Sequence, residues 1–115
     1  MSNPVMHFVI NVYKAKSARK FYQRLFGWKI APVDPKMMHY AEIKRTGKGG
    51  IAGGIAGTNS RGVTMYVGVK NIEAALKKAR KLGGKVTRKV MDIPGDGRIG
   101  WFRDPAGNEI GLWSK

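Results

Sequence analysis

Few side chains in this sequence are suited to acid–base or metal chemistry, because it contains two histidines, seven acidic residues and no cysteine. His7 opens the apolar run HFVINV and is a candidate metal ligand, general base or hydrogen-bonded group on a sheet face. His39, Glu42 and Glu109 are the other candidates that fall in predicted strands. The absence of cysteine excludes disulfides, thiolate metal sites and thiol nucleophiles.

An internal repeat predicts the elements that position these residues. HFVINV at 7–12 aligns with TMYVGV at 64–69 at an offset of 57 residues, and the stretch ending at Gly27 aligns with the one ending at Gly84. Each half is expected to run strand, helix, glycine stop and further strands. We expect strands at 5–12, 28–32, 38–44, 49–57, 63–69, 85–91, 97–103 and 108–113, and helices over AKSARKFYQRLF and IEAALKKARKL.

Side-chain periodicity then predicts which faces are buried. Helical spacing indicates a stripe of Ala18, Phe21, Tyr22 and Leu25 in the first helix, and a buried stripe of Ile72, Ala75, Leu76, Ala79 and Leu82 in the second. Glu73 and Lys77 are spaced for an ion pair along the second helix. Strand alternation turns Phe8, Ile10 and Val12 toward the helices, and His7, Val9 and Asn11 the other way.

The string HFVINVYKAKSARKFYQRLFGW and the ending GRIGWFRDPAGNEIGLW resemble the vicinal oxygen chelate superfamily, the group of glyoxalase I, bleomycin-resistance proteins and extradiol dioxygenases. The resemblance covers nearly the whole chain and is to the small glyoxalase-like branch. It implies an α+β fold of two tandem βαβββ modules, at 4–57 and 63–115 with a linker at 58–62, in one domain over 1–115. It also implies a U-shaped, mostly antiparallel sheet around a groove, helices outside, and a homodimer.

In metal-dependent members of that superfamily, four ligands come from the first and last strands of the two modules. The resemblance places one ligand position at His7 and another at Gly111, and the repeat offset places their companions at Thr64 and Gly54. One imidazole, one hydroxyl and two glycines cannot hold a divalent ion, since catalytic sites need about three protein ligands. The sequence therefore predicts neither a bound metal nor another cofactor.

The lead hypothesis is a protein that binds a small, partly aromatic or anionic molecule in the groove without a catalytic metal. It is either a sequestering protein or an enzyme of lyase or isomerase type that uses His7 as base or hydrogen-bond donor. The expected lining is His7, Asn11, Tyr40, Glu42, Gly54, Thr64, Tyr66, Trp101, Glu109, Gly111 and Trp113. A competing interpretation is that Gly54 and Gly111 only allow close packing, with Tyr66 and Trp113 in the core.

A second alternative is a glyoxalase-type enzyme that depends on a divalent metal, in which Glu109 joins His7 and either His39 or Glu42. A third follows from the formal charge of +15, which attracts polyanions such as nucleic acid. The basic residues are scattered and accompany no nucleic-acid-binding motif, so this charge is also interpreted as a solubility feature, engineered or natural. No long apolar run predicts a membrane span and no signal peptide is recognised, which favours the cytoplasm.

Overall fold

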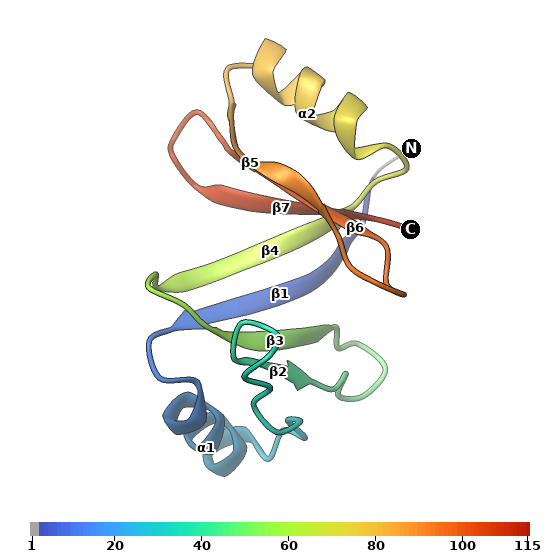
Figure 1. Cartoon of the computed structure of the whole chain (residues 1–115). Coiled ribbons are helices and arrows are strands. Elements are labelled where there is room, and N and C mark those ends of the chain that lie inside the picture. The colour runs from blue at the N-terminus through green and yellow to red at the C-terminus, as the bar shows by residue number, and fades with distance from the viewer. Residues whose placement is uncertain (1–2) are drawn as a thin grey trace. The chain divides into compact units, whose positions relative to one another are not determined.

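A computed structural model describes residues 3–115 as two helices and seven strands in two compact units (Figure 1). The first unit comprises residues 7–64, and the second comprises residues 65–115 together with residues 3–6. The mixture of helices and strands confirms the predicted α+β class.

The first unit places one helix against three strands. Its elements are β1 (Val5–Val12, from His7 onward), α1 (Ala15–Phe26), β2 (Tyr40–Ile43) and β3 (Ala52–Gly57). β3 lies between the other two strands, parallel to β1 and antiparallel to β2. Ile43 and Ile55 are fully buried beneath α1, and Phe8, Ile10 and Val12 pack against the same cluster, as strand alternation predicts.

The first helix ends where its sequence predicts. Gly27 adopts a left-handed conformation with φ of 70°, and its N–H donates to the Gln23 carbonyl over 2.9 Å. A side chain is disfavoured at that φ, which is why glycine commonly follows the last helical turn. The predicted glycine stop is confirmed.

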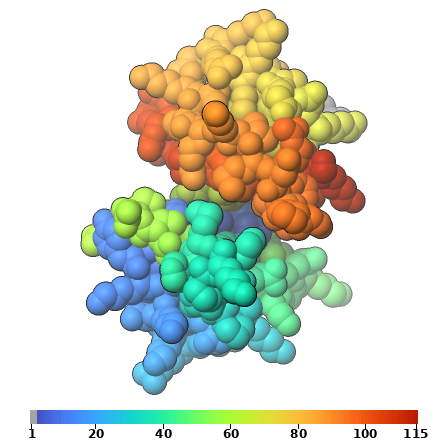
Figure 2. Space-filling model, viewed as in Figure 1, coloured from blue at the N-terminus to red at the C-terminus, as the bar shows by residue number. Residues whose placement is uncertain are grey.

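The strand predicted at 28–32 is reduced to a single bridge between Ile30 and Ile43. Backbone hydrogen bonds flank that bridge, from the Ala31 N–H to the Glu42 carbonyl and from the Lys44 N–H to the Lys29 carbonyl. Pro32 has no N–H to extend this ladder, and the pairing with β2 resumes only at a second bridge between Asp34 and Tyr40. The connection between α1 and β3 (turquoise) is visible on the surface of the first unit in Figure 2.

The second unit places a helix against four strands. Its elements are β4 (Gly62–Gly68, from Met65 onward), α2 (Ile72–Lys81), β5 (Lys85–Asp92), β6 (Arg98–Arg103) and β7 (Glu109–Ser114). The strand order is β4-β7-β6-β5, with β4 parallel to β7 and the other pairs antiparallel. Ile72, Leu76 and Leu112 form the buried cluster between α2 and the strands.

The predicted helix faces are only partly correct. Phe21 and Leu25 of α1 are 58% and 57% exposed, and Leu82 beyond α2 is 71% exposed. The cluster under α1 uses Ala15, Ala18 and Tyr22, so the apolar stripe is wider than the surface that the short strands cover. Glu73 pairs with Arg98 over 2.6 Å, which corrects the predicted partner, Lys77.

Candidate functional site

In the first unit, the strand face turned away from α1 carries His7 and Tyr40. The His7 Nε2 atom and the Tyr40 hydroxyl are 2.7 Å apart, and both residues are half-buried. His7 comes from β1 and Tyr40 begins β2, with β3 between them. The structure therefore brings together an imidazole and a phenol that the sequence placed in one predicted site without specifying their contact.

Gly54 makes this contact possible. A β-carbon built on Gly54 would collide with the hydroxyl end of the Tyr40 ring, so the tyrosine lies over the bare backbone of β3 on its way to His7. In the strand register Gly54 is opposite Val9 on one side and Glu42 on the other. The space that the missing side chain leaves is thus occupied by an aromatic ring of the same chain.

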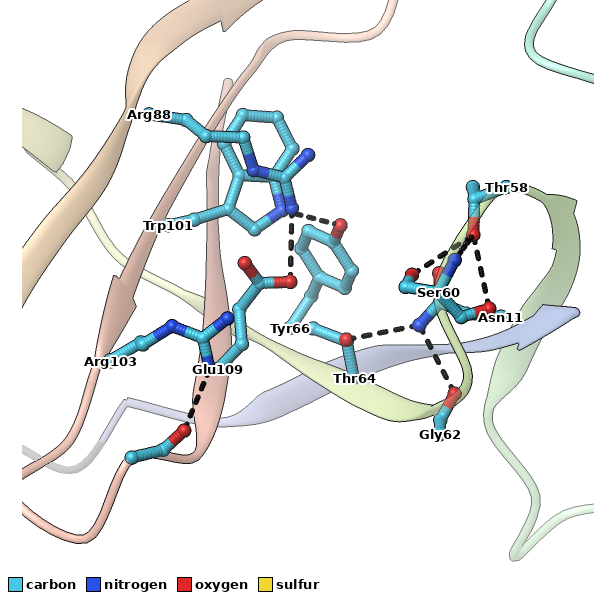
Figure 3. A network of polar contacts seen from close by, with 11 residues as sticks. Asn11, Thr58, Ser60, Gly62, Thr64, Tyr66, Arg88, Trp101, Arg103 and Glu109 are labelled. Carbon is cyan, nitrogen blue, oxygen red and sulfur yellow. Dashed lines mark hydrogen bonds and ion pairs between the residues drawn. The ribbon is translucent and has the colours of Figure 1, made fainter.

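A second polar contact lies farther along β1. The Asn11 amide Nδ2 donates to the Thr64 hydroxyl over 3.3 Å and to the Gly62 carbonyl over 3.1 Å (Figure 3). Thr64 is only 6% exposed, so the amide satisfies a hydroxyl that has little access to water.

In the second unit, four strands that are adjacent in the sheet each contribute one residue to a row across the sheet. Tyr66, Gly111, Trp101 and Arg88 are neighbours in register across β4, β7, β6 and β5. The Trp101 indole N–H donates to the Tyr66 hydroxyl over 2.8 Å, and the Arg88 guanidinium carbon lies 3.9 Å from the centre of the Trp101 ring (Figure 3). That position is suited to a cation–π contact.

Glu109 anchors the free edge of this guanidinium. Its Oε1 accepts from Arg88 Nη2 over 3.0 Å, and 44% of the Arg88 side chain and 25% of the Glu109 side chain remain exposed. The Trp101 ring is almost completely buried, and the Arg88 guanidinium covers it while remaining partly exposed to solvent. We name Tyr66, Arg88, Trp101 and Glu109 the indole network.

Gly111 lies beneath the tyrosine of the indole network, as Gly54 lies beneath Tyr40 in the first unit. A β-carbon at Gly111 would collide with the Tyr66 ring, which occupies the space above this glycine of β7. Burial raises the pKa of the Tyr66 hydroxyl, and this effect outweighs the Trp101 hydrogen bond, which lowers it. Tyr66 is therefore a neutral phenol at physiological pH.

The remaining predicted site residues have other surroundings. The Trp113 indole N–H donates to the Asp96 carbonyl over 2.9 Å, and Glu42 is solvent-exposed on β2. His39 lines a separate hollow of about 590 Å³ beside the start of α1. The hollow is lined by Tyr13, Lys14, Ala15, Lys16, Ser17, Val33, His39, Gly57, Thr58 and Asn59.

Sequence reasoning missed Arg88. It stands in the basic stretch KVTRKV of an exposed strand, where a cation is ordinarily interpreted as a solvated charge. The available signal is the pairing of β5 with β6, which sets Arg88 opposite Trp101, but a register shift on either side of Arg88 hides that pairing from simple alternation.

The chain belongs to the Glyoxalase/Bleomycin resistance protein/Dioxygenase superfamily, whose family model matches residues 5–112. This confirms the resemblance found in the sequence.

Two curated relatives carry different names. The anthracycline biosynthesis protein DnrV of Streptomyces peucetius is 30% identical over 114 residues, covering 83% of this chain and 41% of that protein. The putative glyoxylase CFP32 of Mycobacterium tuberculosis is 28% identical over 115 residues, covering 84% of this chain and 40% of that protein. The chain thus spans about two fifths of the length of these relatives.

Solved structures of low sequence identity share the fold. The hypothetical protein BH1468 from Bacillus halodurans is 15% identical with a TM-score of 0.72, covering 100% of this chain and 96% of that one. Methylmalonyl-CoA epimerase from Mycobacterium tuberculosis is 16% identical with a TM-score of 0.63, covering 96% of this chain and 86% of that one. In neither unit does a helix within residues 3–115 have the length and apolarity needed to cross a membrane.

The four residues that the resemblance and the repeat offset predict at metal-ligand positions do not fit a divalent ion. The His7 Nε2 atom is engaged with the Tyr40 hydroxyl, and the Thr64 hydroxyl accepts from Asn11. Gly54 and Gly111 have no side chain to supply a ligand atom, and tyrosine rings occupy the space above both. Among residues 3–115 no three His, Cys, Asp or Glu side chains are grouped so that they could hold a metal ion.

Proposed function

We propose that this protein binds a small organic molecule with an aromatic ring and an anionic group, and that it does so without a resident metal ion. The observation that carries the proposal is the indole network: a guanidinium stacked on Trp101, half-exposed, and held at one edge by Glu109. An exposed ion pair contributes only about 0–1 kcal/mol. Arg88 is therefore able to exchange its carboxylate partner for an anionic ligand at little energetic cost.

The name of one relative supports an aromatic ligand. The name of the Streptomyces peucetius relative places it in the biosynthesis of anthracyclines, which are polycyclic aromatic compounds. A planar ring has a stacking surface here in the guanidinium plane of Arg88, and the net charge of +15 attracts anions to the whole molecule. The same positive charge would repel a cationic ligand.

A binding titration with salicylate, a hydroxylated aromatic carboxylate, tests this proposal. We expect saturable binding with unchanged affinity after the protein is treated with EDTA, and an about tenfold loss of affinity in Arg88→Gln. Arg80→Gln, which removes an exposed arginine from α2, is the matched control and should bind normally. Affinity restored only by added Zn²⁺ or Ni²⁺ would support the metal-dependent alternative instead.

A second candidate function, metal-independent proton transfer, is favoured by the 2.7 Å contact between His7 and Tyr40. An imidazole hydrogen-bonded to a phenol provides a base and a hydrogen-bond donor at one place. These are the two groups needed to remove a proton from the carbon next to a carbonyl. A methylmalonyl-CoA epimerase that shares the fold at 17% identity has been solved in complex with methylmalonyl-CoA, so that compound is a suitable probe. Exchange of its α-proton with D₂O, insensitive to EDTA and abolished in His7→Gln, is the expected result for an enzyme.

A further inference from the structure

The exposed side of α1 carries an apolar hollow with a cationic rim. Ser17, Phe21 and Leu25 recur every four residues along the helix, and Lys16, Lys20 and Arg24 form the adjacent row. Five of these residues line a shallow hollow of about 440 Å³: Ser17, Lys20, Phe21, Arg24 and Leu25. We name these five the α1 shoulder; Figure 2 shows α1 (blue) at the surface of the first unit.

The aromatic floor of the shoulder is held in place from inside. Phe21 meets Tyr22 edge-to-face with ring centres 5.1 Å apart, and Tyr22 in turn stacks on Trp28 at 5.6 Å. Tyr22 and Trp28 pack against the buried cluster of the first unit. Phe21 is therefore exposed yet restrained by its ring contact, so its side chain loses less conformational entropy when a partner docks against it.

The positive charge of the first unit favours an acidic partner at the α1 shoulder. It contains eleven basic residues against Asp34 and Glu42, and the ion pairs described within residues 3–115, which involve Arg88 and Arg98, are all in the second unit. The basic residues are Lys14, Lys16, Arg19, Lys20, Arg24, Lys29, Lys36, Lys44, Arg45, Lys48 and Arg61. A second copy of this shoulder would bring like charges together, whereas carboxylates would pair with Lys20 and Arg24.

We propose that the α1 shoulder docks an acidic amphipathic helix of a partner protein. The partner's apolar side chains would fill the hollow between Phe21 and Leu25, and its Glu or Asp side chains would pair with Lys20 and Arg24. A hollow suits side chains that project from a helix better than it suits a flat lipid surface. This proposal is independent of ligand binding at the indole network, which lies in the other unit.

The probe is a fluorescein-labelled synthetic helix of about 18 residues, with leucines at helical spacing and glutamates elsewhere, titrated with the whole protein. We expect binding with a Kd of about 10–100 µM, weakened about tenfold or more by Leu25→Ser and by the double variant Lys20→Glu/Arg24→Glu. The matched control is Lys77→Glu/Lys81→Glu, which makes the same change of charge at the same spacing on α2 and should bind nearly normally.

Three further measurements separate the alternatives. A peptide of the same composition with scrambled leucines should bind at least about tenfold more weakly, and equal binding would overturn the proposal in favour of plain charge attraction. Vesicles of phosphatidylglycerol that bind the protein through Leu25, in place of the peptide, would overturn it in favour of a lipid surface. Dimerisation lost in Leu25→Ser would overturn it in favour of a second copy. Because Leu25 and the substituted cations are exposed, all variants should remain folded and show a cooperative thermal unfolding transition.

Discussion

The tyrosine-over-glycine contact is the residue-scale feature that most changes the interpretation of this sequence. Gly54 and Gly111 were expected to leave room for a ligand or to allow close packing. Each instead lies beneath a tyrosine of its own unit, with Tyr40 over the first and Tyr66 over the second. Each phenol then meets a nitrogen-bearing ring, the imidazole of His7 or the indole of Trp101.

Gly111→Ala should lower the free energy of unfolding by about 1–3 kcal/mol, because the new methyl group must displace the Tyr66 ring. Urea unfolding measures this loss. The control is Gly49→Ala, where a β-carbon meets nothing within 4 Å. In a Tyr66→Ala background the cost of Gly111→Ala should nearly vanish, and a cost that persists there would mean that some other contact is responsible.

The Tyr66 hydroxyl predicts a loss of stability in alkali. Its pKa is raised in the folded state by burial, so unfolding favours ionisation once the pH exceeds the ordinary tyrosine value of about 10. The contribution of Tyr66 to the free energy of unfolding is complete below that pH and is lost as the pH rises toward the pKa of the folded state. Urea unfolding from pH 8 to pH 11 should show a smaller alkaline decrease in Tyr66→Phe than in the wild type. Equal decreases would assign the effect to other groups.

At the scale of elements, the two helices begin differently. The Asn71 side chain accepts from the Ala74 N–H over 2.9 Å at the start of α2, and Glu73 follows in its first turn. Lys14 is the N-cap residue of α1, its side chain makes no capping hydrogen bond, and the first turn of the helix contains no acidic residue. A cation beside the positive end of a helix is also electrostatically unfavourable.

Replacing Lys14 by Asp should therefore stabilise the protein by about 0.5–2 kcal/mol, since the carboxylate would accept an unpaired N–H and favour the helix dipole. Thermal and urea unfolding measure the change. Lys16→Asp makes the same change of charge inside the first turn, where no cap is formed, and should give a smaller gain. An equal gain from both variants would assign the effect to charge alone.

Most of this architecture was predictable because local chemistry determines it. Alternating apolar residues and the Gly27 stop are properties of short segments, and the elements they predict agree closely with the observed strands and helices. The strand at 28–32 was not predictable in the same way, since its length depends on pairing with Ile43. Arg88 over Trp101 depends on the irregular register of β5, and the exposure of Phe21 and Leu25 depends on how much of α1 the strands cover.

At the scale of the whole molecule, positive charge is the dominant uncompensated property. In the second unit acidic residues neutralise part of it: Glu73 and Asp92 pair with Arg98, and Glu109 pairs with Arg88. The first unit has only Asp34 and Glu42 against eleven cations. Repulsion among these cations raises the free energy of the compact state.

The stability of the whole chain should therefore rise between about 20 and 300 mM NaCl, a range in which the Debye length shortens from roughly 20 Å to below 8 Å. The double variant Lys36→Gln/Lys44→Gln removes two exposed cations from the first unit. It should be more stable than wild type at low salt and respond less to added salt, as judged by urea unfolding. Lys78→Gln/Lys115→Gln removes the same charge from the second unit and should change the response less. A wild-type stability that falls with salt would show that the pairs made by Arg88 and Arg98 outweigh the repulsion within the first unit.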